Sequence, residues 1–238
     1  MFELVLEPLQ ELIFPSYCLD CNRRLPCREV PLLCGDCLAA IAYINSPRCT
    51  CCGTPFLAGH DHLCGLCLKK TFAFDLARSA LHYREPITSL ISSLKFHGTL
   101  TGLATLAHLA RSAPGKEDLS EPDIILPVPL HPQRLRERKF NQALTISRVC
   151  FPEFKKRIAA DLLLRHLATP PQTSLNGTER RKNLSGAFSL KNQLQVRNKK
   201  VLLIDDVFTS GSTVEECARV LRKAGTKRIE VFTVARAI

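Results

Sequence analysis

Four C-x-x-C pairs in the first third of the chain restrict its fold more than any other feature. The loop between the first two pairs has 12 residues, and the loop between the last two has 11. Two such turns that face each other aim four thiolates at one point, which is the tetrahedral arrangement that structural zinc requires. The spacing predicts two zinc ions held by consecutive pairs, with interleaved pairing as the alternative. The predicted ligands are Cys18, Cys21, Cys34, Cys37, Cys49, Cys52, Cys64 and Cys67.

Two other chemistries for these cysteines fit the sequence less well. A disulfide framework requires an oxidising compartment, whereas residues 1–15 are acidic and have the apolar spacing of a short amphipathic helix, unlike an export signal. A redox-active C-x-x-C is disfavoured by the presence of four pairs at zinc-ribbon spacing. Cys27 and Cys51 are left over, and His60 or His62 can replace a thiolate. A four-thiolate zinc has no open coordination position, so we expect a scaffolding or docking role.

The charge distribution divides the chain near residue 70. Residues 1–70 hold 6 Lys and Arg against 7 Asp and Glu, whereas residues 71–238 hold 27 against 15. We therefore expect an N-terminal helix and cysteine-rich module over 1–70 and a basic domain over 71–238. The cations suit a phosphate-rich partner, either a nucleotide-like ligand or a nucleic acid, with an ordinary basic surface as the alternative. No apolar run of about 18 residues predicts a membrane span, and the absence of an export signal predicts a cytoplasmic protein.

Strands and helices alternate along the basic domain. Helical periodicity and cap signals predict helices from about 86 to 98, 100 to 112 and 213 to 224. Strand-like runs occur in the first part of 77–98, at 123–128, from 162, at 201–204 and at 228–237. This alternation predicts an α/β fold with a parallel sheet and helices on both faces.

The segment "VLLIDDVFTSGST" (201–213) predicts a ligand site. Asp205 and Asp206 follow an apolar strand, at the edge where parallel sheets bind ligands. A glycine and four hydroxyl residues then lead into a helix, whose exposed N–H groups favour an anion. Because the aspartates suit sugar hydroxyls or magnesium, the predicted ligand is a phosphorylated sugar. The spacing fits neither a Walker P-loop nor a G-x-G-x-x-G fingerprint, and a purely structural turn with acids capping the helix is the alternative.

The same segment resembles the phosphoribosyl-pyrophosphate (PRPP) motif of type I phosphoribosyltransferases, with four apolar residues, two acids and the phosphate loop in order. The wider pattern resembles the ComF family, through the N-terminal cysteines, "LKFHG" (94–98), "PVPLHPQRLRERKFNQA" (127–143) and "PPQTSLNGTERRKNLSGAF" (170–188). These segments span nearly the whole chain. The resemblance implies a type I phosphoribosyltransferase fold with a small N-terminal zinc-ribbon module. It also implies transfer of a ribose phosphate from PRPP, with magnesium, to a nucleophile and with pyrophosphate as the leaving group.

The resemblance implies a role for each matched residue. Asp205 and Asp206 would contact the ribose hydroxyls, directly or through magnesium. The phosphate loop would hold the 5-phosphate through Thr209, Ser210, Gly211, Ser212 and Thr213. The loop after strand 123–128 would bind pyrophosphate through the backbone of Pro129, Leu130 and His131 and the charges of Arg134 and Arg138. Lys95 would reach pyrophosphate. The mobile loop of the family would close over the ligand through Arg180, Arg181 and Asn183. For the basic residues, a solvated surface position is the alternative.

The resemblance leaves the catalytic base and the acceptor unnamed. Purine-using relatives carry an acid at the first position of the phosphate loop, where this chain has Thr209, and the only carboxylate in the 170–188 loop is Glu179. The chain also departs from the family at Lys139, where a glycine more often precedes "FNQA". Cys150 and Cys217 read as small apolar core residues.

Two functions of different classes are consistent with the sequence. The first is a magnesium-dependent phosphoribosyltransferase with an acceptor that the sequence does not name. The second is a non-catalytic adaptor that keeps the PRPP-binding fold and handles single-stranded DNA, with a helicase-like partner, during natural transformation. Few exposed aromatic residues are available to stack on bases, which disfavours a dedicated single-strand platform.

Overall fold

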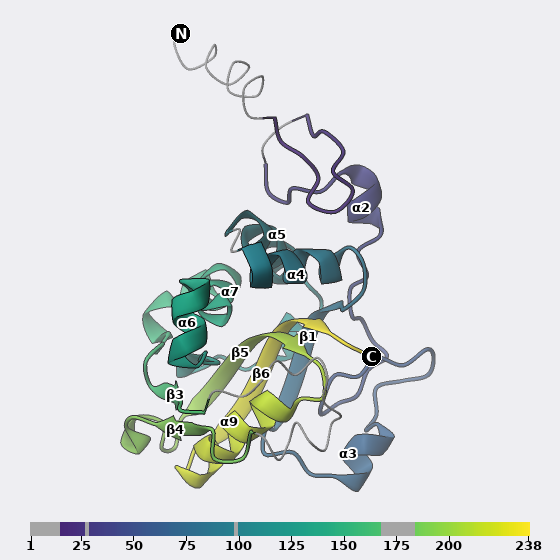
Figure 1. The fold of residues 1–238 in the computed structure, drawn as a ribbon. Coiled ribbons are helices and arrows are strands. Elements are labelled where there is room, and N and C mark those ends of the chain that lie inside the picture. The colour runs from purple at the N-terminus through teal and green to yellow at the C-terminus, as the bar shows by residue number, and fades with distance from the viewer. Residues whose placement is uncertain (1–14, 27–28, 98–99, 168–183) are drawn as a thin grey trace.

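The core of the fold is a four-stranded parallel sheet (Figure 1). The computed structural model describes residues 15–26, 29–97, 100–167 and 184–238, with residues 93–97 and 100–101 described by their backbone only. The strand order is β1–β6–β5–β2, and every neighbouring pair is parallel. The strands of the sheet are β1 (Leu76–His82), β2 (Ile124–Pro127), β5 (Lys200–Phe208) and β6 (Arg228–Arg236). The parallel sheet predicted from the alternation of strands and helices is thus confirmed.

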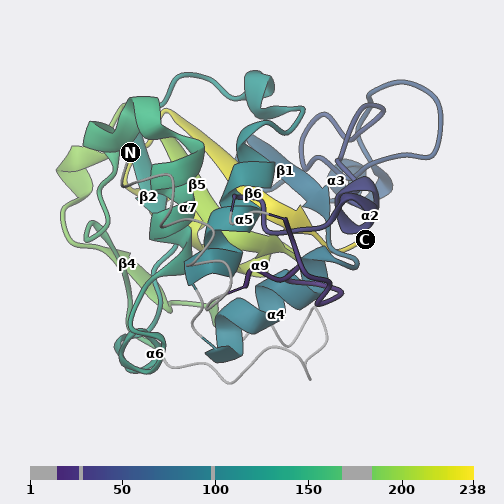
Figure 2. The same cartoon turned by 90° about the horizontal axis from the view of Figure 1, so that it is seen from above.

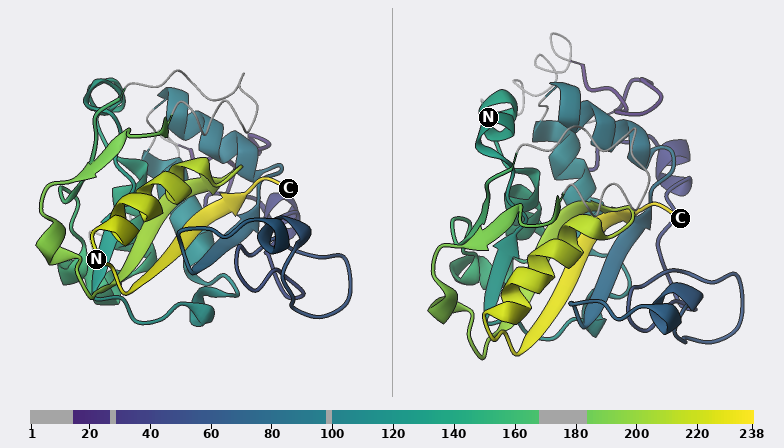
Figure 3. Two further views of the ribbon diagram at one scale, coloured as in Figure 1. Left: turned by 90° about the horizontal axis from the view of Figure 1, so that it is seen from below. Right: turned by 60° about the horizontal axis from the view of Figure 1, so that its bottom comes forward.

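Helices cover one face of the sheet, and a helix with a small second sheet covers the other (Figures 2 and 3). The first face carries α4 (Ile87–His97), α5 (Leu100–Arg111) and α7 (Gln142–Cys150). The second face carries α9 (Ser212–Lys223) and the antiparallel pair β3 (Leu163–Arg165) and β4 (Phe188–Leu190). Because both faces are covered, the central strands read as nearly continuous apolar runs.

Each layer has its own hydrophobic cluster. On the first face, Leu90, Leu103 and Ile146 pack with Ile204 and Phe232 of the sheet, and all five are almost fully buried. Cys150 and Cys217 are buried in the two clusters, as predicted for small core residues. The remaining short helices are α2 (Gly35–Ala39), α3 (Gly65–Lys69), α6 (Pro132–Arg138), η1 (Lys116–Asp118), η2 (Pro152–Arg157) and η4 (Gln193–Gln195).

Two local features bear on the sequence-based predictions: the end of strand β5 and the backbone conformation at Lys139. Strand β5 continues through both aspartates to Phe208, whereas the apolar run predicted an end at residue 204. Its parallel pairing with β6 continues to Arg236, so hydrogen bonding to the neighbouring strand outweighs the polar side chains. Lys139, where relatives more often carry glycine, ends α6 in the left-handed region at φ 64°. The backbone there takes the conformation that glycine favours, at a cost of about 1 kcal/mol for a lysine.

The cysteine-rich part forms two units joined by an extended segment, and we call the unit around Cys18–Cys37 the first ribbon and the unit around Arg48–Cys67 the second ribbon. The first ribbon, with α2, packs on α5, where the Leu32 N–H donates to Thr105 Oγ1 at 3.1 Å. The second ribbon, with α3, joins the cluster on the other face of the sheet (Figure 1). The segment between them runs beside β1, since the Ile44 N–H donates to the Ala80 carbonyl at 3.0 Å. The ribbons therefore hold the β1 edge from both faces.

In the ranges that the structure describes, no helix has the length and apolar composition needed to cross a membrane. The helix expected over residues 1–15 lies almost entirely outside the described residues, as does the cap expected at Gly98.

Gly53 provides a test of how tightly the second ribbon packs on β1. It has φ 74°, and a Cβ built there would lie 2.6 Å from the carbonyl oxygen of Ala77. We expect Gly53→Ala to lower the free energy of unfolding by about 3 kcal/mol, from backbone strain and overpacking together. Urea denaturation of the zinc-loaded protein measures the change.

Gly59→Ala is the matched control, because Gly59 also has positive φ, at 100°, but open space around a built Cβ. It should cost only the backbone strain, about 1 kcal/mol. Equal losses for the two variants would show that the ribbon does not press on Ala77.

Candidate functional site

Asp205 and Asp206 stand side by side at the carboxyl end of β5, and both side chains are half-buried. The Asp206 N–H donates to Asp205 Oδ1 at 2.9 Å, and the Val207 N–H donates to Asp206 Oδ1 at 2.7 Å. These bonds hold one oxygen of each carboxylate against the backbone. The strand thereby presents two oriented carboxylates at the edge where ligands of parallel sheets bind.

The phosphate loop leads from β5 into α9. Thr209 and Ser210 are exposed, and Ser212 is buried at the first turn of the helix. The Ser210 and Ser212 hydroxyls lie 2.8 Å apart, and the Ser212 N–H reaches Ser210 Oγ only at 3.4 Å. Because the first N–H groups of a helix have no intrahelical acceptor and carry its positive dipole, this loop offers several donors to an anion.

A side chain at position 211 would require either this loop or the Phe208 ring to move. It precedes α9 with φ 71°, and a Cβ built there would lie 2.5 Å from Phe208 Cζ. Both the backbone conformation and the contact with the ring disfavour a side chain. The ring of Phe208 therefore forms the floor of the phosphate loop.

Guanidinium groups from two other elements lie near the aspartates. Burial lowers the pKa of Arg138, on α6, while the charge of Asp206 opposes this shift. Burial and the neighbouring Arg134 lower the pKa of Arg165, on β3, while Cys217 and Asp205 oppose it. These three arginines give the site a positive potential that suits a polyanionic ligand.

Arg165 is a site residue that the sequence interpretation missed. It interrupts an apolar run, "LLLRH" (162–166), and such a cation in a short, partly buried strand is a signal of a charge partner nearby. Its guanidinium also lies over the Phe188 ring of β4, 5.5 Å from the centroid. Only the pairing of β3 with β4 and their packing on α9 bring it toward Asp205, so tertiary structure was needed to place it.

The loop between β2 and α6, which is predicted to bind pyrophosphate, follows the carboxyl end of β2. Pro129 is buried, while Leu130 and His131 are half-buried. His131 caps α6 by accepting the Gln133 N–H at Nδ1, 3.3 Å away, and the Asn141 side chain donates to the Val128 carbonyl at 3.1 Å. A hollow of about 680 Å³ opens beside this loop, between α6 and β3.

The structure does not describe the side chains of the remaining predicted lid and pyrophosphate residues. Arg180, Arg181 and Asn183 lie outside the described residues, as does Glu179, and Lys95 is placed in α4 by its backbone only. The segment that contains the first three lies between β3 and β4 in the sequence, and β3 carries Arg165.

The structure gathers the eight predicted cysteine ligands into two groups of four, in consecutive pairing. Within each group, all the sulfur atoms lie within 4.8 Å of one another. The Cys34 N–H donates to Cys18 Sγ, and the Cys64 N–H donates to Cys49 Sγ, both at 3.3 Å. Four converging thiols with N–H···S bonds fit a tetrahedral structural zinc.

The thiols within each group differ in protonation, since burial raises the pKa of Cys37 and of Cys67. Burial raises the pKa of Cys18, but N–H donors of Cys34, Asp20 and Cys21 outweigh burial and lower it to about 6. Cys49 behaves in the same way, with a pKa of about 6. Zinc binding replaces the remaining thiol protons with a cation, so the folding of each ribbon is coupled to metal binding.

Neighbouring side chains have other roles. His62 stacks on Phe56 with 4.0 Å between ring centroids, and its Nδ1 lies 2.8 Å from the His60 carbonyl oxygen. Neither histidine belongs to the second group of four, which consists of thiols. Cys51 is half-buried beside that group, and Cys27 lies outside the described residues.

Arg236, at the end of β6, connects the second ribbon to the phosphate loop. Its guanidinium donates to the Cys52 carbonyl at 2.8 Å and to Thr54 Oγ1 at 2.6 Å. The same group lies over the Phe208 ring, 4.3 Å from the centroid. A buried cation therefore joins a predicted zinc ligand to the ring beneath Gly211.

Comparisons with known proteins agree with this description. The double zinc ribbon domain matches residues 9–68, and the phosphoribosyl transferase domain matches residues 157–238. Competence protein F of Haemophilus influenzae is 35% identical over 94% of this chain and 98% of its own. The DNA utilization protein YhgH of Escherichia coli K12 is 31% identical over 95% of this chain and 100% of its own.

More distant matches have related descriptions. Competence protein ComFC of Streptococcus pneumoniae is 26% identical over 86% of this chain and 87% of its own. A solved structure of glutamine PRPP amidotransferase from B. subtilis is 18% identical, with a TM-score of 0.33 over 57% of this chain and 28% of that one.

The cysteine geometry predicts two zinc ions per chain. Elemental analysis of protein purified without added metal should find two equivalents, and Cys21→Ser and Cys67→Ser should each lose one, because each removes a ligand from a different group. Fewer than one equivalent in the unmodified protein would contradict the assignment.

The contacts of Arg236 predict that its loss loosens the second ribbon selectively. Arg236→Gln removes the donors to Cys52 and Thr54 and should lower the free energy of unfolding by about 2–4 kcal/mol. One of the two zinc ions should pass to a colorimetric chelator at least about tenfold faster, since 1.4 kcal/mol corresponds to a factor of ten.

Arg23→Gln is the matched control, because Arg23 pairs with Asp36 in the first ribbon and both side chains are well exposed. It should release both ions at the unmodified rate. If Arg236→Gln also keeps both rates, the connection through Arg236 does not hold the ribbon.

Proposed function

Because the chain belongs to the competence protein F family and carries a double zinc ribbon and a phosphoribosyltransferase domain, we propose that it binds PRPP with magnesium and acts in DNA uptake. One observation carries the ligand assignment. The two oriented carboxylates of Asp205 and Asp206 stand directly before an anion-binding helix start, at the carboxyl edge of a parallel sheet.

Each part of the site suits one part of this ligand. Asp205 and Asp206 accept hydrogen bonds from the ribose hydroxyls, and residues 209–213 donate to the 5-phosphate from their N–H groups and hydroxyls. Arg134, Arg138 and Arg165 supply positive charge for the pyrophosphate. The site combines carboxylates for the ribose hydroxyls, a loop for the 5-phosphate and separate arginines. A phosphorylated sugar that also carries a pyrophosphate group therefore fits it better than a simple phosphate.

Magnesium fits the same residues. Its preferred ligands are carboxylate and phosphate oxygens, and the two aspartates offer carboxylates beside the proposed ribose position. When bound, it would neutralise charge that develops on the departing pyrophosphate. The protein's own contribution would be to orient the ribose and to stabilise that charge with the arginines.

For the enzymatic activity, we infer transfer of the phosphoribosyl group, which is a pentosyl transfer. Thr209 at the first loop position has no carboxylate to act as a general base. The base must therefore come from another part of the chain or from the substrate that receives the phosphoribosyl group. The zinc sites, with four thiols each, would act only as scaffolding.

The second candidate function is a non-catalytic adaptor that binds single-stranded DNA, with a helicase-like protein as its partner and a cytoplasmic location. The observation that favours it is the net excess of 12 cations in residues 71–238, beyond the few arginines that face the site. The relatives named for competence and DNA utilization are consistent with both candidates.

Calorimetry with PRPP and magnesium tests the ligand assignment. Asp205→Asn/Asp206→Asn should weaken PRPP binding at least about 100-fold, because two hydrogen bonds to charged groups are lost. The control is Asp36→Asn/Asp161→Asn, which removes two exposed carboxylates that pair with Arg23 and Lys191 away from the site. It should bind PRPP like the unmodified protein.

The same variants separate the two candidate functions. If the unmodified protein does not bind PRPP, but binds single-stranded DNA equally well with and without the aspartate changes, the adaptor function replaces the transferase. A melting temperature measured for each variant identifies any loss that comes from unfolding.

A further inference from the structure

The edge of the sheet opposite the candidate site carries a second concentration of positive charge. In a parallel sheet all the strands begin at one edge, so this edge is a strand length away from Asp205 and Asp206. Strands β5 and β6 begin there at Lys200 and Arg228, which are partners in the strand register. We call the following exposed or half-exposed cations around these strand starts the basic edge: Arg197, Lys199, Lys200, Lys223 and Lys227.

Backbone contacts hold these residues close together. The Lys227 N–H donates to the Lys199 carbonyl at 3.0 Å, and the Asn198 N–H donates to the Gly225 carbonyl at 2.9 Å. The Arg197 side chain passes Gly225, with its Cγ 3.4 Å from the position of a Cβ built there. Two loops, one before β5 and one after α9, therefore present their cations on one surface.

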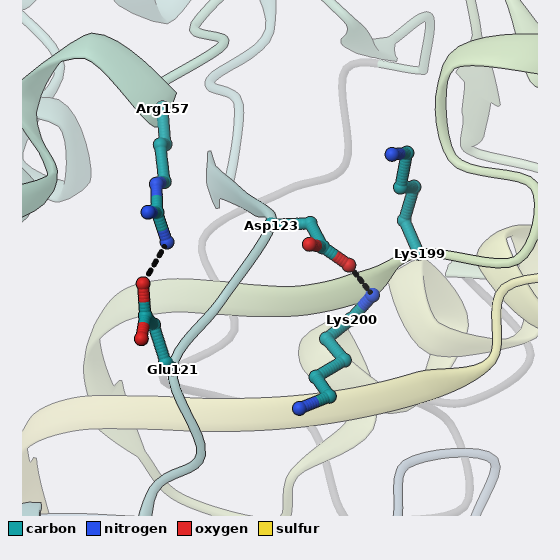
Figure 4. A pocket seen from close by; sticks show the side chains of 5 residues that line it. All are labelled: Glu121, Asp123, Arg157, Lys199 and Lys200. Carbon is teal, nitrogen blue, oxygen red and sulfur yellow. Dashed lines mark hydrogen bonds and ion pairs between the residues drawn. The ribbon is translucent and has the colours of Figure 1, made fainter.

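Two carboxylates lie beside the basic edge, and each has a hydrogen-bonding partner. Glu121 pairs with Arg157 at 2.7 Å, and Asp123 accepts the backbone N–H of Lys200 at 2.8 Å (Figure 4). Within the described part of the chain, no ion pair joins a carboxylate to a side chain of the basic edge. Figure 4 shows the Lys199 side chain directed away from the Asp123 and Glu121 carboxylates. These three residues line a hollow of about 430 Å³, together with Arg157 and Lys200.

We propose that the basic edge binds the sugar-phosphate backbone of single-stranded DNA, while the carboxyl edge remains open to PRPP. The proposal deepens the role in DNA uptake proposed above and rests on it. Several exposed cations without carboxylate partners are the electrostatic footprint of a nucleic-acid partner. Binding here would be independent of base sequence, because the cations would contact phosphates, which carry no sequence information. The described residues around these strand starts include no exposed aromatic side chain that could stack on a base.

The basic edge and the PRPP site lie at opposite edges of the sheet. A strand held at the starts of β5 and β6 does not occupy the phosphate loop, which follows the opposite end of β5. DNA and PRPP should therefore bind at the same time. A single shared phosphate-binding cleft would instead make them compete.

The test uses fluorescence anisotropy of a labelled 30-nucleotide oligo(dT) over a range of salt concentrations. Arg197→Gln/Lys199→Gln/Lys227→Gln should weaken binding about tenfold or more at low salt and reduce the slope of log K against log salt by about 2, at roughly 0.7 per phosphate contact. The matched control, Arg24→Gln/Lys69→Gln/Arg111→Gln, removes the same charge from exposed positions elsewhere and should bind within about twofold. Saturating PRPP with magnesium should not displace the oligonucleotide.

Three results would overturn the proposal: equal binding by the two triple variants, displacement of the oligonucleotide by PRPP, or absence of DNA binding by the unmodified protein at low salt. Calorimetry with PRPP does not depend on any of them, so the proposed ligand can stand when the basic edge fails. Melting temperatures of both variants should match that of the unmodified protein, since the substituted side chains are exposed.

Discussion

The contact between the Arg236 guanidinium and the Phe208 ring is the interaction on which the arrangement of the candidate site depends. Phe208 ends β5 and supports Gly211, while Arg236 ends β6 and donates to Cys52 and Thr54 of the second ribbon. A buried guanidinium needs several acceptors to offset its desolvation, and the ribbon supplies them. The metal-binding part thus helps to form the loop that we propose holds the 5-phosphate.

This dependence gives the cysteines a structural purpose beyond their own ribbons. The ribbons contribute side chains to the hydrophobic clusters on opposite faces of the sheet. A second polar connection reinforces the attachment, because Arg48 of the second ribbon and Arg78 of β1 share the Asp118 carboxylate. Loss of one zinc would therefore disturb the large domain as well as the ribbon.

Much of this organisation could be predicted from the sequence, because strong local rules govern it. The C-x-x-C spacing predicted the two groups of thiols, and the apolar strand followed by two acids predicted the position of the carboxyl edge. The end of β5 was predicted too early, since pairing with β6 continues beneath polar side chains. The place of Arg165 beside Asp205 depends on the packing of β3 and β4 on α9, which no local pattern encodes.

Both lateral edges of the main sheet are already paired with irregular chain. Along β1, the His82 N–H donates to the Ala42 carbonyl at 2.9 Å, and along β2, the Ala159 N–H donates to the Ile125 carbonyl at 2.9 Å. A strand with its outer hydrogen-bonding groups satisfied is a poor template for a strand from another molecule. Strand addition from another molecule is therefore disfavoured along these two edges of the main sheet, and an assembly of this protein is expected to use its other surfaces.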